Sequence, residues 1–542
     1  MMRFASLLLF CVLALIGGFW FWLGKPVGMP PHAAQLNEPI YCVSFAPFRA
    51  DQSPLDPTSS RITAQQVEED LTRIRKVTDC VRTYATDFGS QHVPAIARKL
   101  GMKIYLGIWI GDGEMGNRVQ IETALALAAR YPDVVRAIIV GNEVLLRRDQ
   151  SPAAMAALLK EVKSRASVPV TYADVWEFWL KNPELGALVD FITIHTLPYW
   201  EDIPISADKA AAHIDETRKE VQKAFPGKEI LIGEVGWPSA GRMREGALPS
   251  LSNQARLLAD MVRVAREGGY KFNWIEVIDQ PWKRRNEGTV GGYWGIFEAG
   301  AEQPKFRTGA PVSDHPFWRV QAAGGAGLAV LVFGVALFLA RKREEKISRT
   351  QWLGVSVIAL TSGALIGLSV EKLVLESLNA REWLFSSARV VAMLIAVIAG
   401  VYGLIARAEV PSLARLQGQG VRLEWRNARL LDLAFAALCF FVLQSALAIA
   451  FDPRYRDFPA ATLTIGLMPF LMMHLTAPER RKAGLHAILA TLLGGFTLWI
   501  VVNEGFANWQ ALWFSGALAF AVLLISGFWP QNQRQQNEGR RA

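Results

Sequence analysis

Eight long apolar stretches limit what this chain can fold into. The first runs from Phe4 to Leu23, and the others are Trp318–Ala340, Trp352–Leu373, Phe385–Ala406, Leu431–Phe451, Ala460–Thr476, Leu485–Val502 and Trp509–Trp529. Each is close to the ~20 apolar residues with which a helix crosses a bilayer. Hydrophobic residues make up 51% of the 542 residues, which agrees with a protein that lies partly in lipid. We therefore expect one N-terminal and about seven C-terminal transmembrane helices, with a globular domain between the first and the second.

The N-terminal stretch has two interpretations. Its apolar run exceeds the ~7–15 residues of a signal-peptide core, which favours an uncleaved membrane anchor. A cleaved signal peptide is the alternative. Both interpretations predict that the segment after it is exported.

The basic residues between the apolar stretches predict the orientation. Alternate loops and the C-terminal tail share a surplus of them: Arg341, Lys342, Arg343, Lys346, Arg349, Arg407, Arg415, Arg422, Arg426, Arg429, Arg480, Arg481, Lys482, Arg534, Arg540 and Arg541. The opposite loops carry only Arg381, Arg454 and Arg456. The positive-inside rule then places both termini in the cytoplasm and the globular domain outside. These loops explain the formal net charge of +9, and because no basic stripe with interleaved aromatics occurs, we expect no nucleic-acid partner.

The globular domain alternates short apolar runs with helical patterns. The runs are Tyr41–Pro47, Val81–Tyr84, Lys103–Trp109, Val135–Glu143, Val168–Val175, Phe191–Pro198, Glu229–Trp237 and Trp274–Gln280. The helical patterns are Ala64–Lys76, Val93–Leu100, Arg118–Ala129, Ala153–Arg165, Ala207–Ala224 and Asn253–Glu267. This alternation predicts an α/β fold with a parallel sheet, and eight repeats suit a (β/α)₈ TIM barrel. A doubly wound open sheet is the alternative, but no glycine-rich phosphate loop follows the first run.

Two glutamates end predicted strands of this barrel. Glu143 closes the fourth run, in Val140-Gly141-Asn142-Glu143, and Glu234 lies near the end of the seventh, in Gly233-Glu234-Val235. Barrel enzymes place their chemistry at the carboxyl ends of the strands, and a pair of carboxylates there is typical of glycosidic bond cleavage. A structural ion pair is the usual role of a single strand-end glutamate, but two such glutamates favour catalysis. Asn142 is expected to bind a sugar hydroxyl beside the reacting carbon.

Aromatic residues follow the predicted strand ends, among them Trp109, Trp176, Tyr199, Trp237 and Trp282. Their faces suit stacking on a pyranose ring, and ordinary core packing is the alternative for about half of them. His195 ends the sixth run, where it would orient the nucleophile or a bound sugar. The alternative is a core histidine whose hydrogen bonds are all made inside the barrel. No Cys or His has metal-ligand spacing, so neither a metal nor a cofactor is expected.

Two of the four cysteines, Cys42 and Cys80, open the first and second runs of the exported domain. They are therefore candidates for neighbours. A disulfide is one outcome in an oxidising compartment. Two buried thiols is the interpretation that we favour from the sequence.

Several motifs resemble glycoside hydrolase family 17, the β-1,3-glucanases and glucanosyltransferases. Val140–Glu143 and Gly233–Ser239 are similar to the acid/base and nucleophile motifs of that family. Further matches follow in order: Val81–Tyr84 with Asp87, Leu106–Trp109, Asp279–Lys283 and Tyr293–Phe297. The resemblance covers roughly residues 38–310. It implies Glu143 as acid/base, Glu234 as nucleophile, and Arg82, Tyr84, Trp109, Asp279, Trp282 and Lys283 as substrate-binding residues.

The chain departs from the family in two respects. Gln280 stands where the fungal branch usually has a second acidic residue, and secreted glucanases have no counterpart of the apolar stretches. Anchor, barrel and C-terminal spans together resemble the bacterial membrane-bound β-(1,6)-glucan synthase proteins of cyclic β-1,3/1,6-glucan synthesis. The chain has neither an Asp-x-Asp pair nor a Gln-x-x-Arg-Trp sequence, which a polymerase that uses nucleotide sugars would need. Synthesis is therefore expected to proceed by transglycosylation.

These features predict five segments: an anchor at 1–24, a linker at 25–38, the catalytic barrel at 39–312, a multi-span helical domain at 313–530 and a cytoplasmic tail at 531–542. We expect a retaining enzyme in the bacterial inner membrane, with its barrel in the periplasm. It would transfer β-1,3-glucan and form β-1,6 linkages. The expected partners are β-glucan poly- or oligosaccharide, the lipid bilayer and a separate glucan synthase. The alternatives are a hydrolytic β-1,3-glucanase, a non-catalytic glucan-binding subunit, and a membrane part that conducts glucan, with Glu371, Lys372 and His474 as its polar candidates.

Overall fold

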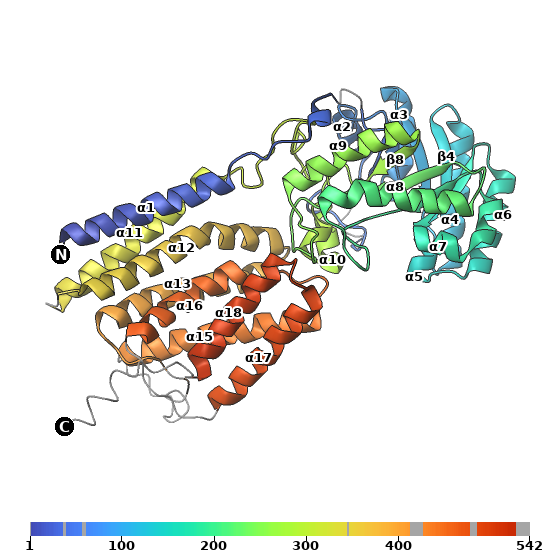
Figure 1. The fold of residues 1–542 in the computed structure, drawn as a ribbon. Coiled ribbons are helices and arrows are strands. Elements are labelled where there is room, and N and C mark those ends of the chain that lie inside the picture. The colour runs from blue at the N-terminus through green and yellow to red at the C-terminus, as the bar shows by residue number, and fades with distance from the viewer. Residues whose placement is uncertain are drawn as a thin grey trace. The chain divides into compact units, whose positions relative to one another are not determined.

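Eight parallel strands form a closed barrel in the computed structural model of the protein (Figure 1). The structure describes residues 2–35, 39–56, 61–343, 346–411, 413, 427–476 and 485–526. The strands are β1 Cys42–Ser44, β2 Cys80–Arg82, β3 Lys103–Ile108, β4 Val135–Asn142, β5 Val170–Val175, β6 Ile192–His195, β7 Ile230–Val235 and β8 Lys271–Trp274. They follow one another around the barrel in chain order, and β8 closes it by pairing with β1. The barrel is consistent with the predicted TIM fold and excludes the open doubly wound sheet.

Helices between the strands surround the barrel. Six correspond to the helical patterns in the sequence: α2 Ala64–Ile74, α3 Val93–Leu100, α4 Glu114–Arg130, α6 Pro152–Arg165, α8 Ala207–Ala224 and α9 Leu251–Gly268. Three shorter helices, α5 Val144–Arg147, α7 Trp176–Lys181 and α10 Arg284–Gly291, follow strand ends and have no clear sequence period. Local signals explain where helices begin. Ser151, for example, accepts a hydrogen bond from the N–H of Ala154, and Pro152 occupies the first helical position of α6.

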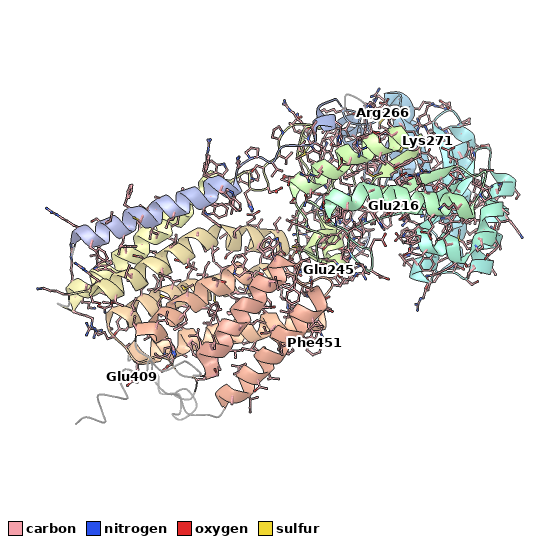
Figure 2. All side chains as sticks on the ribbon, in the orientation of Figure 1. Glu216, Glu245, Arg266, Lys271, Glu409 and Phe451 are labelled. Atoms are coloured by element: carbon pink, nitrogen blue, oxygen red, sulfur yellow. A yellow bond between two sulfur atoms is a disulfide. The ribbon has the colours of Figure 1, made fainter. Side chains whose placement is uncertain are left out.

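The eighth strand lies earlier in the chain than predicted. It spans Lys271–Trp274, whereas the sequence favoured Trp274–Gln280. Lys271, labelled in Figure 2, opens the strand and pairs with Glu229 at 2.8 Å. The polar residues Lys271 and Asn273 interrupt the apolar pattern by which the sequence indicates a strand. Asn273 lies inside the barrel, where it donates to Ser44 Oγ and to the carbonyl of Gly233. The following apolar residues are buried in loop structure.

Cys42 and Cys80 form a disulfide, so the interpretation as two thiols was wrong. The parallel register of β1 and β2 explains the pairing. Val43 lies opposite Val81, which places the two preceding cysteines side by side, with their Cα atoms 4.5 Å apart. A bond between the first two strands suits an oxidising compartment.

Residues predicted as a linker belong in part to the barrel unit, which comprises Pro26–Asp314. Val27 forms a backbone bridge with Val312, and His32 Nε2 lies 2.8 Å from Asp260 Oδ1. The short helix η1 Pro31–Gln35 packs against α9. The N-terminal and C-terminal segments of this unit are thus held together beside the barrel.

The second unit, Met1–Lys25 with His315–Ala542, is helical. Its helices are α1 Met2–Leu23, α11 Trp318–Lys342, α12 Arg349–Glu376, α13 Ala380–Ile405, α15 Asn427–Phe451, α16 Ala460–Thr476, α17 Leu485–Glu504 and α18 Trp509–Ser526. By length and composition, seven helices of the described chain could cross a membrane, and α16 is apolar but shorter. All eight predicted stretches are helices. The predicted tail 531–542 and the basic residues Arg415, Arg422, Arg426, Arg480, Arg481 and Lys482 lie outside the described residues.

Small residues and paired polar groups pack this helical unit. A Cβ on Gly363 would lie 2.7 Å from the carbonyl oxygen of Gly325, so α11 and α12 approach closely there. The polar candidates for a conduit have partners of their own: Glu371 accepts from Gln321 at 2.9 Å, and Lys372 lies 3.1 Å from Asp457. Large apolar side chains are exposed on the outside of the unit, such as Phe451, which is labelled in Figure 2.

Candidate active site

Both strand-end glutamates lie next to an irregularity in their strand. The register of β4 against β5 shifts between Ile139 and Asn142, and that of β7 against β8 shifts between Ile232 and Val235. A β-bulge of this kind redirects the following side chain and is common beside active sites. Gly141 has φ +86 within the first shift. The irregularities therefore re-aim Glu143, which follows the first shift, and Glu234, which lies within the second.

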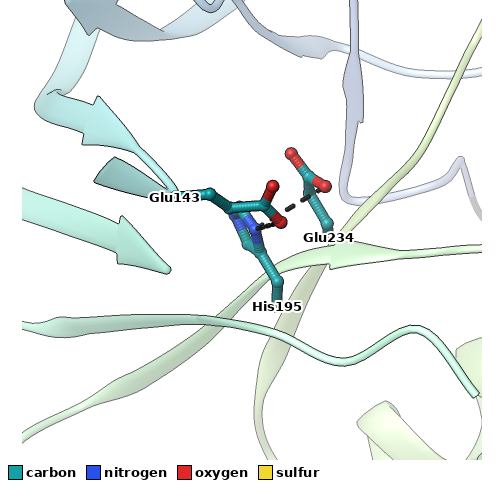
Figure 3. Close-up of side chains that lie close together, drawn as sticks. All are labelled: Glu143, His195 and Glu234. Carbon is teal, nitrogen blue, oxygen red and sulfur yellow. Dashed lines mark hydrogen bonds and ion pairs between the residues drawn. The ribbon is translucent and has the colours of Figure 1, made fainter. Parts of the chain in front are cut away.

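The two glutamates meet at the side chain of His195 (Figure 3). His195 Nδ1 lies 2.9 Å from Glu143 Oε1 and 3.6 Å from Glu234 Oε2. One nitrogen of the histidine and one oxygen of each glutamate all lie within 4.8 Å of one another. Retaining glycosidases hold their carboxyl groups ~5–5.5 Å apart, whereas inverting enzymes need ~6.5–9.5 Å. The observed spacing belongs to the shorter class.

Arg82 organises this cluster from the second strand, where it is almost fully buried. Its Nη1 donates to the carbonyl of Gly233 at 2.6 Å and lies 3.3 Å from Glu234 Oε1. Its Nη2 donates to Asn142 Oδ1. The guanidinium thus connects the ends of β4 and β7, and its positive charge suits an ionised Glu234. Its position indicates a structural and electrostatic role rather than direct contact with a ligand.

The partners of His195 define its hydrogen positions. Arg82 Nη1 lies 3.2 Å from His195 Nε2 and can only donate, so Nε2 accepts. The hydrogen then resides on Nδ1 and is donated to Glu143 Oε1. Burial lowers the pKa of His195 to about 3, so the ring stays neutral near pH 7. The histidine therefore orients Glu143 and adds no charge to the cluster.

The same three side chains are close enough to hold a metal ion by distance alone. The Arg82 guanidinium, however, lies against both Glu234 and His195. A bound cation would face this fixed positive charge, and His195 Nε2 is already engaged. The donor set therefore suits an acid–nucleophile pair better than a metal centre.

Burial raises the pKa of Glu143 above its ordinary value, against the charges of Arg147, Arg82 and Lys283, which lower it. A raised pKa keeps a carboxyl protonated to higher pH and suits a general acid. Tyr84 lies beside the pair, with the Arg82 guanidinium 4.9 Å from its ring centre. Burial and the nearby Glu234 raise the pKa of Tyr84 well above its ordinary value, so its hydroxyl remains a donor.

Two further carboxyls near this pair were missed in the sequence. Glu276 follows β8, is buried and forms an ion pair with Lys283. Burial raises the pKa of Glu276, and it raises the pKa of Glu287, on α10, to about 7. The charges of Glu143 and Glu234 both act on Glu287. The misplaced eighth strand concealed Glu276, because the predicted run put this residue inside the strand.

Three of the predicted aromatic residues present accessible surface. Trp109 is 41% exposed, and the guanidinium of Arg147 covers one of its faces at 4.2 Å. Trp176 is half-buried, and its indole N–H has no hydrogen-bond acceptor within the described residues. Trp282 is half-buried and donates from Nε1 to Gln280 Oε1 at 2.7 Å. Gln280, the departure from the fungal pattern, therefore orients Trp282.

Three other predicted binding residues are buried and make hydrogen bonds or ion pairs within the protein. Tyr199 and Trp237 are fully buried, and they donate to the carbonyls of Arg242 and Leu248. Their ring faces are covered, so the expectation that they stack on a sugar does not fit this structure. Asp279 is also buried, where it pairs with Lys305 at 2.7 Å and accepts from the N–H of Gly295. It ties the closing loop to the barrel and is already paired within the protein.

A closed parallel barrel with two carboxyls facing one another at its strand ends is the arrangement of many glycosidases. Residues 42–295 match the family model of the BtgE/BtgC glycoside hydrolase domain. The barrel of this chain is therefore similar to a glycoside hydrolase domain.

Curated relatives are also similar to this chain. "Probable beta-glucosidase btgE" of Aspergillus fumigatus is 29% identical over 226 residues, which is 40% of this chain and 39% of that protein. "Probable glucan endo-1,3-beta-glucosidase btgC" of Aspergillus clavatus is 27% identical over 281 residues, which is 46% of this chain and 39% of that protein. The chain thus spans about two fifths of the length of these curated relatives.

A solved structure is also similar. The glycoside hydrolase family 17 β-1,3-glucanosyltransferase from Rhizomucor miehei is 27% identical, with a TM-score of 0.43. The match covers 49% of this chain and 95% of that one. An active-site mutant of that enzyme was solved with laminaritriose, at 25% identity and a TM-score of 0.43.

Proposed function

We propose that this protein is a membrane-anchored retaining enzyme that transfers β-1,3-glucan chains, with Glu143 as general acid/base and Glu234 as nucleophile. The observation that carries this proposal is the pair of carboxyls held within 4.8 Å by His195. The names of the curated relatives support β-1,3-glucan as the substrate class. Formation of β-1,6 linkages rests on the resemblance to bacterial membrane-bound glucan synthase proteins.

The first step would use the two glutamates together. A carboxylate oxygen of Glu234 attacks the anomeric carbon and forms a new C–O bond. The glycosidic C–O bond breaks, and its oxygen takes the proton of Glu143 to become a sugar hydroxyl. The product is a covalent glycosyl-enzyme. The amide N–H₂ of Asn142 would bind a hydroxyl beside the reacting carbon, because its Oδ1 already accepts from Arg82.

The second step decides between transfer and hydrolysis. An acceptor oxygen attacks the anomeric carbon, its proton passes to Glu143, and the bond to Glu234 breaks to restore the carboxylate. Sugar hydroxyls compete with water when an acceptor site holds them in position. The half-buried Trp176 and Trp282, the latter oriented by Gln280, are the side chains that we assign to acceptor binding.

Membrane anchoring is part of the same proposal. Seven apolar helices of spanning length, exposed apolar side chains on their outer faces, and basic residues in alternate loops support it. The barrel would then lie in the periplasm of a bacterium and both termini in the cytoplasm. The Cys42–Cys80 disulfide agrees with such an exported barrel.

Product analysis tests transfer. The full-length protein in detergent micelles is incubated with millimolar linear β-1,3-gluco-oligosaccharides, and products are analysed by mass spectrometry and NMR. We expect products longer than the donor, some with new linkages. Trp176→Ala should shift products toward hydrolysis without abolishing cleavage, and Trp176→Phe, which keeps an aromatic face, should shift them less. Only shorter reducing sugars from the wild type would contradict transfer and favour a hydrolytic β-1,3-glucanase. No cleavage at all would favour a non-catalytic binding subunit.

A further inference from the structure

The turn that carries Glu143 has an unfavourable backbone conformation. Glu143 has φ 52 and ψ 36, in the left-handed region between β4 and α5. This region is unfavourable for a residue other than glycine, so surrounding contacts must hold it in place. The side chain can reach a substrate only in the direction that this turn sets. The residues that hold the turn therefore affect the chemistry of Glu143 without touching a substrate.

Strand β5 supplies those contacts. The N–H of Glu143 donates to the carbonyl of Ala173 at 2.8 Å. Two residues further on, the N–H of Leu145 lies 3.1 Å from Asp174 Oδ2 and 3.0 Å from the hydroxyl oxygen of Tyr172. The Tyr172 hydroxyl donates in turn to Asp174 Oδ2. Asp174 and Tyr172 are both buried, behind the turn and away from solvent.

Among the described residues, every hydrogen-bond partner of the Asp174 carboxyl is a donor. Oδ2 accepts from Leu145 and Tyr172, and Oδ1 accepts from the N–H of Val175 at 2.8 Å. A carboxylate can accept all three hydrogen bonds. An asparagine could accept on one oxygen only, and its NH₂ group would meet a donor in either orientation. The position therefore requires an aspartate for its acceptors and not for its size.

We infer that Asp174, together with Tyr172, is a positioning residue for the general acid/base, because it fixes the turn that aims Glu143 across the site. This inference rests on the proposed role of Glu143. Its consequence is selective: proton transfer to the leaving oxygen should suffer when Asp174 is changed. The attack by Glu234 should be unaffected, because Arg82 and β7 hold Glu234 independently of Asp174.

Leaving groups distinguish these two effects. A sugar oxygen needs the proton of Glu143 to depart, whereas a dinitrophenolate departs without it. The full-length enzyme is assayed on a laminari-oligosaccharide and on a 2,4-dinitrophenyl β-laminarioligoside. We expect Asp174→Asn to lower kcat/KM on the oligosaccharide about 10- to 100-fold, and on the dinitrophenyl substrate by less than about 3-fold. Both rates come from one preparation, so the folded fraction cancels in their ratio.

Two further variants complete the experiment. Tyr172→Phe keeps the charge of Asp174 but removes one acceptor of the Leu145 N–H, so we expect a smaller selective loss. It provides the test if Asp174→Asn does not fold. Asp190→Asn is the matched control, because Asp190 accepts from the N–H of Val170 at the opposite end of β5. It should leave the ratio of the two rates unchanged.

Equal losses on both substrates, in Asp174→Asn or in Tyr172→Phe, would overturn the inference. Glu143→Gln separates this outcome from failure of the proposed function. If Glu143→Gln loses activity selectively on the oligosaccharide and the Asp174 variant does not, only the positioning role fails. If Glu143→Gln shows no such selectivity, the acid/base assignment fails as well.

Discussion

At the scale of single residues, burial and a few nearby charges favour different protonation states for Glu143 and Glu234. Arg82 places a fixed positive charge against Glu234, while burial raises the pKa of Glu143. His195 stays neutral between them because its pKa is lowered to about 3. One carboxyl is thereby suited to donate a proton and the other to attack. The two environments differ, as acid/base assignments in glycosidases require.

Lys283 offers a test of this electrostatic account. Glu143 must be protonated in the first step, so kcat/KM should fall as pH rises through its pKa. The charge of Lys283 lowers that pKa. Lys283→Met should therefore raise the pKa of Glu143 and move the alkaline limb of the pH profile to higher pH, by up to about one unit.

Lys305→Met is the control for this shift. Lys305 is also a buried lysine paired with a buried carboxylate, Asp279, but it is not among the charges that act on Glu143. The alkaline limb of the pH profile of Lys305→Met should stay at the wild-type position. A limb that moves to lower pH in Lys283→Met, or one that moves equally in both variants, would contradict the account.

At the scale of secondary-structure elements, the irregular strand ends matter most. The shifts in β4 and β7 aim Glu143 and Glu234, and glycines precede both residues. At Gly141, φ is +86, and a Cβ would lie 2.5 Å from Val144 Cγ2 and 3.5 Å from Tyr172 Cε2. The left-handed conformation of Gly141 is thus part of the irregularity in β4, and it places Gly141 next to Tyr172, which contacts the turn.

Gly141→Ala should therefore impair stability and catalysis together. The left-handed conformation costs about 1–2 kcal/mol, and the contact with Val144 adds to it. The displaced turn should also lower kcat by more than about 10-fold. Thermal unfolding and activity, measured below the transition, check both effects.

Gly101→Ala is the matched control at the end of α3. Gly101 has φ +69, but a Cβ there would meet no atom within 4 Å. Gly101→Ala should lower the free energy of unfolding by a similar backbone cost and keep full activity. If Gly141→Ala and Gly101→Ala have the same kcat, the bulge does not aim Glu143.

The regular elements could be predicted from the sequence, and the irregular ones could not. Continuous apolar runs identify seven strands because both faces of a barrel strand are buried. Strand β8 was displaced because Lys271 and Asn273 interrupt its apolar pattern. Glu143 and Glu234 were found from their positions at strand ends. The roles of Glu276 and Asp174 and the environment of Tyr199 depend on contacts between residues far apart in the sequence, which no periodicity reveals.

At the scale of the whole molecule, the chain combines a barrel that matches a glycoside hydrolase domain with a unit of apolar helices. A half-buried polar pair, Glu371 with Gln321, links α12 to α11, and large apolar side chains are exposed on the outside of the unit. That distribution suits a bundle surrounded by lipid.

Reporter fusions test the proposed orientation. Glu409 follows α13 and Phe451 ends α15, and Figure 2 shows them at opposite ends of the helical unit. A reporter fused after Phe451 should behave as exported, as should one after Lys305. Reporters after Glu409 and after Arg541 should behave as cytoplasmic. The reverse pattern would contradict the proposed topology and exclude an extracytoplasmic glucan as substrate.

The central claim is that Glu234 forms a covalent intermediate while Glu143 supplies the proton. It is tested most directly by trapping that intermediate on the full-length enzyme with a 2-deoxy-2-fluoro-β-laminarioligosyl fluoride. The fluorine slows both steps, and the fluoride leaves without acid assistance, so the glycosyl-enzyme should accumulate. Digestion and mass spectrometry should locate one added sugar chain on the peptide that contains Glu234, and Glu234→Gln should remain unlabelled. A label on another residue, or cleavage of natural glucan by Glu234→Gln at near-normal rates, would contradict the account.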